Sequence, residues 1–501
     1  MSGIKQLASQ TAWYGLSNII GRFINYLLTP LLTSIYAPAA FGDISLLFAI
    51  AAFLNIIFTY GMETSYFRFI QLEDEKKVFN NAFSSLLITT VLFSAMLILP
   101  APSIAKYLQL EGHEEYILLV IGIVALDTFA VLPFSKLRHE GRPKKFALIK
   151  ISNILINVSL VIFFLHICKP AFENGENNFW SALYSPSIGI GYVFVAQLIA
   201  SGITLLLLFK EFKSYQIDIN PDLIKNILLY SSPLIIVGFG GMINETIDRL
   251  MIVQRFDGTA EAAKAANGIY SANNKLAILI VIFIQTFRMG AEPFFFKTSS
   301  NEDAKITYAR IMNFFVITCC CCFLAVVLYL DIWKYFMGVH KNPAYAEGLF
   351  IVPMLMISKI FLGVYYNLSI WYKLTNKNMM GAVITIIGAF ITIVVNYAFI
   401  PTLGYLASAI ANLACYGIMM LISIWLGNKY YPVPYNWMKS FGYLLLACVF
   451  YVLHQTLRNQ SVDILYLHLA GTGLFILYII ILLRAEKEEL RKIPYLSRLY
   501  N

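Results

Sequence analysis

Long apolar runs separated by short polar segments make up most of this sequence. Fourteen of the runs reach about 20 residues, enough for a helix to cross the hydrocarbon core of a bilayer. One long polar connection, residues 169–189, interrupts the pattern. The pattern predicts an all-α integral membrane protein. The expected spans are residues 11–36, 42–66, 80–104, 116–135, 146–167, 186–209, 226–254, 265–296, 306–330, 345–372, 378–400, 403–427, 438–456 and 463–483.

The first twelve spans contain a head-to-tail repeat. Gly61–Arg68 reads GMETSYFR and Gly290–Lys297 reads GAEPFFFK, so each copy is G-x-E-x-x-x-F followed by a cation. Three further pairs correspond at similar spacing: Arg22 with Arg249, Gly42 with Gly268, and Lys136-Leu137 with Lys373-Leu374. A fixed long period indicates duplicated structural units. We therefore expect two parallel-repeat six-helix bundles around a central cavity, residues 1–212 and 213–430, with two additional helices and a tail in residues 431–501.

Composition and charge support this interpretation. Hydrophobic residues make up 59% of the chain, and the mean hydropathy is +0.70, which is too apolar for a soluble protein of 501 residues. Of the 37 Lys and Arg residues, 24 lie in segments on the side of the termini, 7 on the opposite side and 6 within spans. The positive-inside rule then predicts cytoplasmic termini. The basic residues are scattered over short loops, which argues against nucleic-acid binding, and the N-terminus lacks the pattern of a cleaved signal peptide.

Charges inside the predicted spans are the main candidates for function. A charged side chain at the centre of a membrane helix costs about 2.5–3.5 kcal/mol on insertion scales, so it normally faces water or a polar partner. In the first span Asn18, Arg22 and Asn25 share one helix face with two threonines. We expect this stripe to line a polar cavity. The alternative is that Arg22 forms an ion pair with an acid such as Asp127 of span four.

Spans seven and eight carry a second set of charges. Glu245, Asp248 and Arg249 are helix neighbours, so either they face a cavity or Glu245 simply neutralises Arg249. Lys275 and Arg288 follow in span eight and point in different directions on a straight helix. Lys359 lies within span ten. The candidate substrate-binding residues are therefore Arg22, Arg249, Lys275, Arg288, Lys359, Asn18 and Asn25.

Acidic residues suggest two further roles. Asp127, Glu245 and Asp248 are candidates for coupling to a proton or sodium gradient, because a titratable acid in a low-dielectric site can exchange its charge. The motif glutamates, Glu63 and Glu292, lie at helix ends, each followed by the motif cation, Arg68 or Lys297. We expect these four residues to act in ion-pair gating or helix anchoring.

Other chemistry is disfavoured. Four of the seven cysteines, Cys319–Cys322, are contiguous in one span and point around the whole helix, so they cannot converge on one metal ion. We expect no metal and no organic cofactor. The one long loop, near Glu173 and Glu176, has no convincing acid/base arrangement, so neither a glycosyltransferase nor a polymerase is expected. A purely structural scaffold would not need cations along cavity-facing helices.

Several motifs occur in a recognisable order along the whole chain. These motifs resemble the polysaccharide transporter branch of the multidrug/oligosaccharidyl-lipid/polysaccharide (MOP) flippase superfamily, which includes the Wzx-type O-antigen flippases. The matching segments are Trp13–Arg22 (WYGLSNIIGR), Leu28–Thr33 (LTPLLT), Tyr36–Gly42 (YAPAAFG), Asp248-Arg249, Gly268–Tyr270 (GIY) and Asn396–Ala411 (NYAFIPTLGYLASAIA).

The resemblance implies alternating access in a bacterial inner membrane. The implied substrate is an oligosaccharide linked to undecaprenyl pyrophosphate, flipped to the periplasmic leaflet for assembly of O-antigen lipopolysaccharide, capsule or exopolysaccharide, with a polysaccharide polymerase as downstream partner. Cations within the spans suit a pyrophosphate. Two alternatives stay open: a flippase for the peptidoglycan precursor lipid II, and a multidrug or cation antiporter.

Overall fold

The computed structural model describes residues 19–21, 23–24, 26–460 and 463–491, and this part of the chain is helical without a strand. Twelve helical segments are long and apolar enough to cross a membrane. Two shorter apolar helices, Ile19–Ile35 and Gly191–Leu207, bring the number to the fourteen that the sequence predicts. The start of the first predicted span lies outside the described residues, and the other bounds agree with the predictions to within about six residues, so the all-α membrane architecture is confirmed.

Contacts between helices divide the chain into two compact units. Unit 1 consists of Met1–Ala272, Gly338–Tyr345 and Thr385–Ala411, and unit 2 of Asn273–Met337, Ala346–Ile384 and Asn412–Asn501. Four helical elements contribute residues to both units: α13 (Ala260–Thr298), the 3-10 helix Pro343–Ile351, α18 (Asn378–Leu403) and α19 (Tyr405–Tyr430). The division into bundles at residues 212 and 430 stays a prediction.

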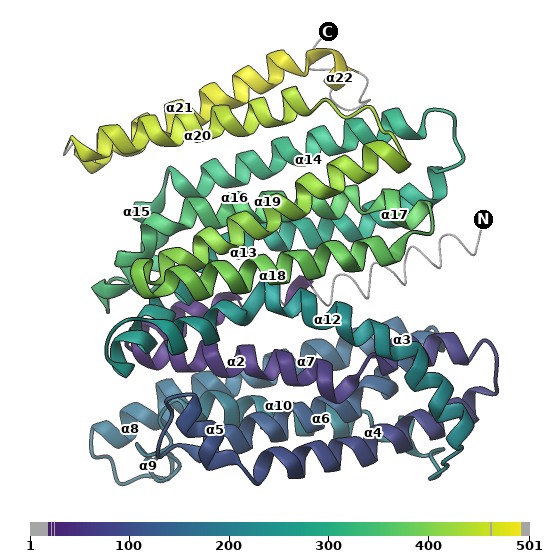
Figure 1. The fold of residues 1–501 in the computed structure, drawn as a ribbon. Helices are drawn as coiled ribbons and strands as arrows, with labels where there is room; N and C mark the ends of the chain where they lie inside the picture. The colour runs from purple at the N-terminus through teal and green to yellow at the C-terminus, as the bar shows by residue number, and fades with distance from the viewer. Residues whose placement is uncertain (1–18, 22, 25, 461–462, 492–501) are drawn as a thin grey trace. The chain divides into compact units, whose positions relative to one another are not determined.

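Unit 1 contains most of the first repeat, with α10 packed against α6 and α7, and α2 packed against α6 and α12 (Figure 1). Its other helices and their bounds are α2 (Pro38–Thr59), α3 (Met62–Phe69), α4 (Glu75–Ile98), α5 (Ala101–Tyr107), α6 (Glu114–His139), α7 (Pro143–Ile162), the π-helical turn Phe163–Cys168, α8 (Lys169–Glu173), α9 (Phe179–Ala182), α10 (Gly191–Leu207), α11 (Phe209–Phe212) and α12 (Pro221–Arg255).

The repeated G-x-E motif has a different backbone in each copy. In the first copy the chain turns at Tyr60 and Gly61, whose φ angles are 33° and 72°, so the span divides into α2 and α3. Glycine adopts such left-handed angles without steric cost. In the second copy Gly290 lies inside the continuous helix α13. The same motif therefore ends a helix in one copy and continues it in the other.

Two glycines that correspond in the repeat pack against each other within unit 1. A Cβ atom on Gly42 of α2 would lie 2.1 Å from the carbonyl oxygen of Lys264, and one on Gly268 of α13 would lie 1.8 Å from the carbonyl oxygen of Pro38. The Asn267 amide donates a 2.8 Å hydrogen bond to the Gly42 carbonyl. Only glycine at these positions lets the two backbones approach so closely.

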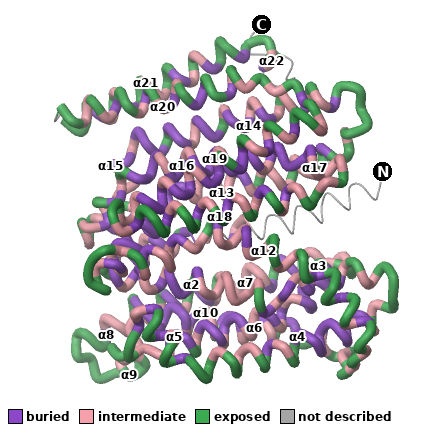
Figure 2. The backbone as a smooth tube through the Cα atoms, in the orientation of Figure 1, coloured by how far each residue is buried: buried purple, intermediate pink, exposed green. Residues whose placement is uncertain are grey.

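Unit 2 is built around α16, the central part of the span Pro343–Leu374, which has 72% of its most apolar stretch buried, against 17% for the peripheral α21 (Figure 2). Helix α14 packs against both α16 and α20. The remaining bounds are α14 (Ala304–Val327), α15 (Leu330–Phe336), the 3-10 helix Pro343–Ile351, α16 (Val352–Leu368), α17 (Ile370–Leu374), α20 (Trp437–Asn459), α21 (Ile464–Ala485) and α22 (Lys487–Arg491).

The two additional helices, α20 and α21, are tied to the rest of unit 2 by buried carboxylates. Glu486, at the end of α21, has an exposed fraction of 2%. It bonds three side chains: Asn313 at 2.7 Å, Tyr443 at 2.5 Å and Lys439 at 2.9 Å. Near the opposite end of α20, Arg458 pairs with Asp331 of α15 at 2.6 Å. Because a buried carboxylate must be paired or hydrogen-bonded, these contacts hold both ends of α20.

Candidate functional site

The predicted site residues of the first span, Asn18, Arg22 and Asn25, lie outside the described residues. The other predicted site residues fall into three groups: a cluster where α12 meets the start of α13, a dispersed group, and the ion pairs of the two copies of the repeated motif. Their contacts decide which candidates are held by protein partners and which are open to a ligand.

The first cluster joins α12 to the start of α13. Asp248 is 2% exposed and accepts a hydrogen bond from the Tyr270 hydroxyl. The Arg249 guanidinium bonds the Asp248 carboxylate at 3.2 Å and the backbone carbonyl of Glu245 at 3.0 Å. Glu245 itself is exposed, and its carboxylate forms no ion pair with another described residue. Arg249 is therefore held by Asp248 rather than by the Glu245 side chain.

The second group of candidates is dispersed. Asp127 of α6 is half-buried and accepts a 2.7 Å hydrogen bond from the Ser201 hydroxyl of α10. In unit 2, Lys359 of α16 is 4% exposed, donates to the Asn412 side chain at 3.3 Å and lies 4.8 Å from the ring centre of Tyr416. Lys275 is half-buried on α13. Asp127 and Lys359 thus each have a side-chain partner within their own unit.

The third cluster contains the glutamate of the repeated motif. In the first copy Glu63 pairs with Arg138 at the end of α6, and the Arg138 guanidinium lies 4.9 Å from the ring centre of Phe67. Arg68, five residues from Glu63, is exposed. The cation that contacts Glu63 thus comes from another helix and not from the motif itself.

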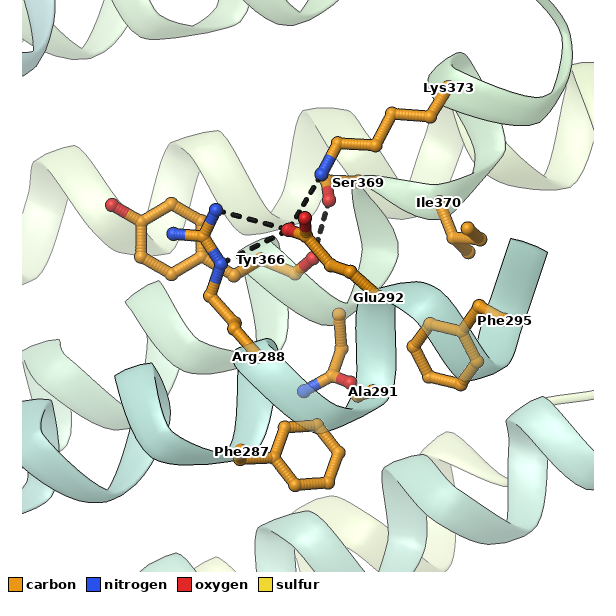
Figure 3. Close-up of a pocket in the computed structure, with 10 residues that line it drawn as sticks. Phe287, Arg288, Ala291, Glu292, Phe295, Tyr366, Ser369, Ile370 and Lys373 are labelled. Atoms are coloured by element: carbon orange, nitrogen blue, oxygen red, sulfur yellow. Dashed lines mark hydrogen bonds and ion pairs between the residues drawn. The ribbon is translucent and has the colours of Figure 1, made fainter. Parts of the chain in front are cut away.

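The second copy forms a larger arrangement (Figure 3). Glu292 of α13 accepts hydrogen bonds from Lys373 of α17 at 2.7 Å and from Arg288 at 3.1 and 3.3 Å. The Arg288 guanidinium stacks 4.1 Å from the ring centre of Tyr366. Lys297 is exposed. A small pocket surrounds the charges and is lined by Phe287, Arg288, Ala291, Glu292, Phe295, Tyr366, Asn367, Ser369, Ile370 and Lys373.

In both copies, therefore, the motif glutamate pairs with a cation at the end of a later span. Glu63 of span two pairs with Arg138 at the end of span four, and Glu292 of span eight pairs with Lys373 at the end of span ten. Arg138 and Lys373 are the residues that the sequence interpretation omitted. The repeat register carried a signal for Lys373, because it aligns Lys136-Leu137 with Lys373-Leu374, but Arg138 lies two residues beyond the aligned lysine. Among the described residues no group of histidine, cysteine and acidic side chains could hold a metal ion.

The sequence comparison identifies a family. The family model described as polysaccharide biosynthesis protein matches residues 7–299, which is more than half of the chain. No curated protein matches the sequence significantly.

Solved structures resemble the whole fold at low sequence identity. The lipid II flippase MurJ in an inward closed conformation has a TM-score of 0.65 at 13% identity, covering 94% of this chain and 99% of its own. An inward-facing multidrug resistance MATE family transporter of the MOP superfamily has a TM-score of 0.59 at 13% identity, with coverages of 82% and 95%. A MOP superfamily transporter from Pyrococcus furiosus has a TM-score of 0.53 at 15% identity, with coverages of 83% and 95%. This multi-pass membrane protein belongs to the polysaccharide biosynthesis protein family and has the fold of the MOP superfamily transporters.

Proposed function

We propose that this protein is a flippase that moves an undecaprenyl-pyrophosphate-linked oligosaccharide from the cytoplasmic to the periplasmic leaflet of a bacterial inner membrane. The product would serve the assembly of O-antigen, capsule or exopolysaccharide by a downstream polymerase. The main support is the family match combined with the cations Arg249, Lys275, Arg288 and Lys359 within or at the ends of apolar helices. Such charges are rare in membrane helices and mark pathways for polar groups.

We assign headgroup binding first to Arg22 and Arg249, the arginines that correspond in the repeat. The test is flipping in proteoliposomes, scored as the fraction of an undecaprenyl-pyrophosphate oligosaccharide that an external glycan-modifying enzyme reaches. We expect protein-dependent accessibility that is lost in the Arg22→Ala/Arg249→Ala double variant and kept in Arg484→Ala, an exposed arginine at the end of α21. Unchanged flipping in the double variant would contradict the assignment, and no flipping across several glycans and ion gradients would contradict the function.

Ion coupling is part of the proposal. Asp127, Glu245 and Asp248 are the candidate acids, and Glu245 is tested first because it is the exposed one and its carboxylate forms no ion pair with another described residue. We expect an imposed H⁺ or Na⁺ gradient to accelerate flipping by the wild type and not by Glu245→Gln. Equal rates with and without either gradient would show that transport is uncoupled.

The second candidate is a lipid II flippase, favoured by the coverage and TM-score of the MurJ structure. Rescue of a strain that lacks its peptidoglycan-precursor flippase would select this function. A multidrug antiporter is the third candidate, because the MATE transporters share the fold. The intramembrane cations disfavour cationic drugs, so we expect no drug resistance on overexpression.

A further inference from the structure

We propose that Arg288 and Lys373 form a pyrophosphate-binding site whose place is taken by the carboxylate of Glu292 in the structure described here. Entry of the lipid-linked substrate would move Glu292 aside and put the pyrophosphate between the two cations. Lys373 thereby becomes a substrate-binding residue. This inference rests on the proposed function for the identity of the natural ligand.

The geometry around Glu292 is that of an occupied anion site. A single oxygen, Oε1, accepts hydrogen bonds from Lys373 Nζ at 2.7 Å, Arg288 Nη2 at 3.1 Å and Arg288 Nε at 3.3 Å. The cations come from two different helices, α13 and α17, and converge on that oxygen (Figure 3). Arginine and lysine bind carboxylate and phosphate oxygens through the same charge-assisted hydrogen bonds. A phosphate oxygen can therefore replace Oε1.

Charge balance favours the exchange. Two cations face one carboxylate, so the cluster carries a surplus of one positive charge. A pyrophosphate diester carries two negative charges and would neutralise both cations at once. The Arg288 guanidinium is also packed on the ring of Tyr366 at 4.1 Å, a cation–π contact that does not involve Glu292. Arg288 thus stays positioned when the carboxylate leaves.

The three side chains are also accessible. Their exposed fractions are 35% for Arg288, 34% for Glu292 and 24% for Lys373, and they line a pocket. Ion pairs that are partly exposed contribute little to stability, so a competing anion can separate Glu292 from its partners. The cluster lies near the end of α13, on the side that the distribution of basic residues predicts to be cytoplasmic. This is the side on which a flippase with the proposed direction must collect its substrate.

The other copy of the motif provides an internal comparison. Among the described residues, Glu63 forms an ion pair with one cation, Arg138, and the neighbouring Lys136 ammonium lies 5.3 Å from the ring centre of Phe79 instead. One acid and one cation leave no surplus charge. We therefore assign the anion site to the second copy, whereas the Glu63–Arg138 pair only holds α3 against α6.

Direct binding tests the site without transport. The full chain is purified in uncharged detergent, and its affinity for farnesyl pyrophosphate is measured by calorimetry. We expect Arg288→Gln and Lys373→Gln to weaken binding by roughly tenfold or more, the usual effect of removing a charged hydrogen bond. Glu292→Gln should instead tighten binding several-fold, because it removes the competing charge. Arg484→Gln, which removes an exposed cation at the end of α21 outside the pocket, should bind like the wild type.

The sign of the Glu292→Gln effect is decisive. A structural ion pair would give unchanged or weaker binding in this variant, which would overturn the proposal, as would wild-type affinity in both cation variants. A gain of affinity cannot arise from misfolding. Competition by phosphatidylglycerol equal to that by farnesyl pyrophosphate would overturn the assignment to pyrophosphate. If the wild type flips the substrate but the variants bind farnesyl pyrophosphate like the wild type, the site is rejected and the proposed function stands. If the variants change binding as expected but the wild type flips no substrate, the proposed function is rejected and the site stands.

Discussion

At the level of single residues, two carboxylates of this chain are bonded by cations from other helices. Glu292 is bonded by Lys373, and Glu211 of α11 is bonded by Arg142 and Lys145, which lie at the start of α7. A buried carboxylate that keeps its charge needs such partners, because desolvation otherwise drives it to the neutral form. These ion pairs therefore report tertiary packing and not local sequence.

Glu211 gives a pH-dependent prediction outside the spans. Burial raises its pKa, but the hydrogen bonds and charges of Lys145 and Arg142 outweigh burial and hold the pKa below its ordinary 4.5. A folded-state pKa below the unfolded value stabilises the protein fully above about pH 4.5, and this stabilisation is lost as the pH falls through the folded-state pKa. We expect Glu211→Gln to lower the free energy of unfolding by about 1–2 kcal/mol at pH 7. This difference from the wild type should shrink as the pH falls. Thermal unfolding in detergent between pH 7 and pH 3 measures it.

The exposed Glu488, whose side chain is 83% exposed, supplies the control. Glu488→Gln should leave the unfolding temperature unchanged over the same pH range. A deficit of Glu211→Gln that stays constant from pH 7 to pH 3 would show that ionisation of Glu211 does not stabilise the fold.

At the level of elements, the length of an apolar run was enough to predict each span, because a membrane helix must satisfy its own backbone hydrogen bonds. Span four, predicted at residues 116–135, is α6 (Glu114–His139). Side-chain partners could not be predicted in this way. Arg68 follows Glu63 by five residues, about 140° around a helix, whereas Arg138 reaches Glu63 only through the packing of α3 on α6.

The crossing of α2 and α13 predicts an unusual cost for alanine. Alanine normally favours a helix over glycine by about 1 kcal/mol, but a Cβ atom at Gly42 or Gly268 would meet a backbone carbonyl at 2.1 or 1.8 Å. Backbone cannot move aside as a side chain can, so overpacking should dominate and destabilise by about 1–3 kcal/mol or more. Thermal unfolding and expression level of Gly42→Ala and Gly268→Ala measure the effect.

Gly290→Ala on the same helix is the matched control, since a Cβ atom there meets nothing within 4 Å. We expect this variant to be as stable as the wild type or slightly more stable. Equal stability of all three variants would mean that the close approach of α2 and α13 is not needed in the folded protein.

At the level of the whole molecule, the fold class and family followed from the apolar pattern, the repeat and the order of the motifs. The candidate site was predicted less completely. Arg288 was identified because a charge within an apolar run is conspicuous, but Lys373 lies just beyond the end of α16 and looked like one more basic loop residue. Only its convergence on Glu292 distinguishes Lys373 from Lys297 or Lys377.

The membrane topology is a prediction for the whole chain. With fourteen spans and both termini in the cytoplasm, the segment of residues 169–189 is predicted to lie on the opposite, periplasmic side of the membrane. A green fluorescent protein fused after Asn501 should fluoresce, and alkaline phosphatase inserted at Glu176 should be active. Phosphatase activity of a C-terminal fusion would reverse the orientation or change the number of spans.

The close approach of α2 and α13 at Gly42 and Gly268 can be compared with the interface of a homodimer. In a homodimer, a residue meets its own copy only at the two-fold axis of an isologous interface. Gly42 and Gly268 correspond in the sequence repeat and meet within a single chain. In a single chain, two corresponding positions can carry different residues: Asn267 bonds the Gly42 carbonyl, whereas Phe41, which corresponds to Asn267 in the repeat, packs in an apolar core. An asymmetric contact of this kind is available to a fused chain and not to two identical subunits.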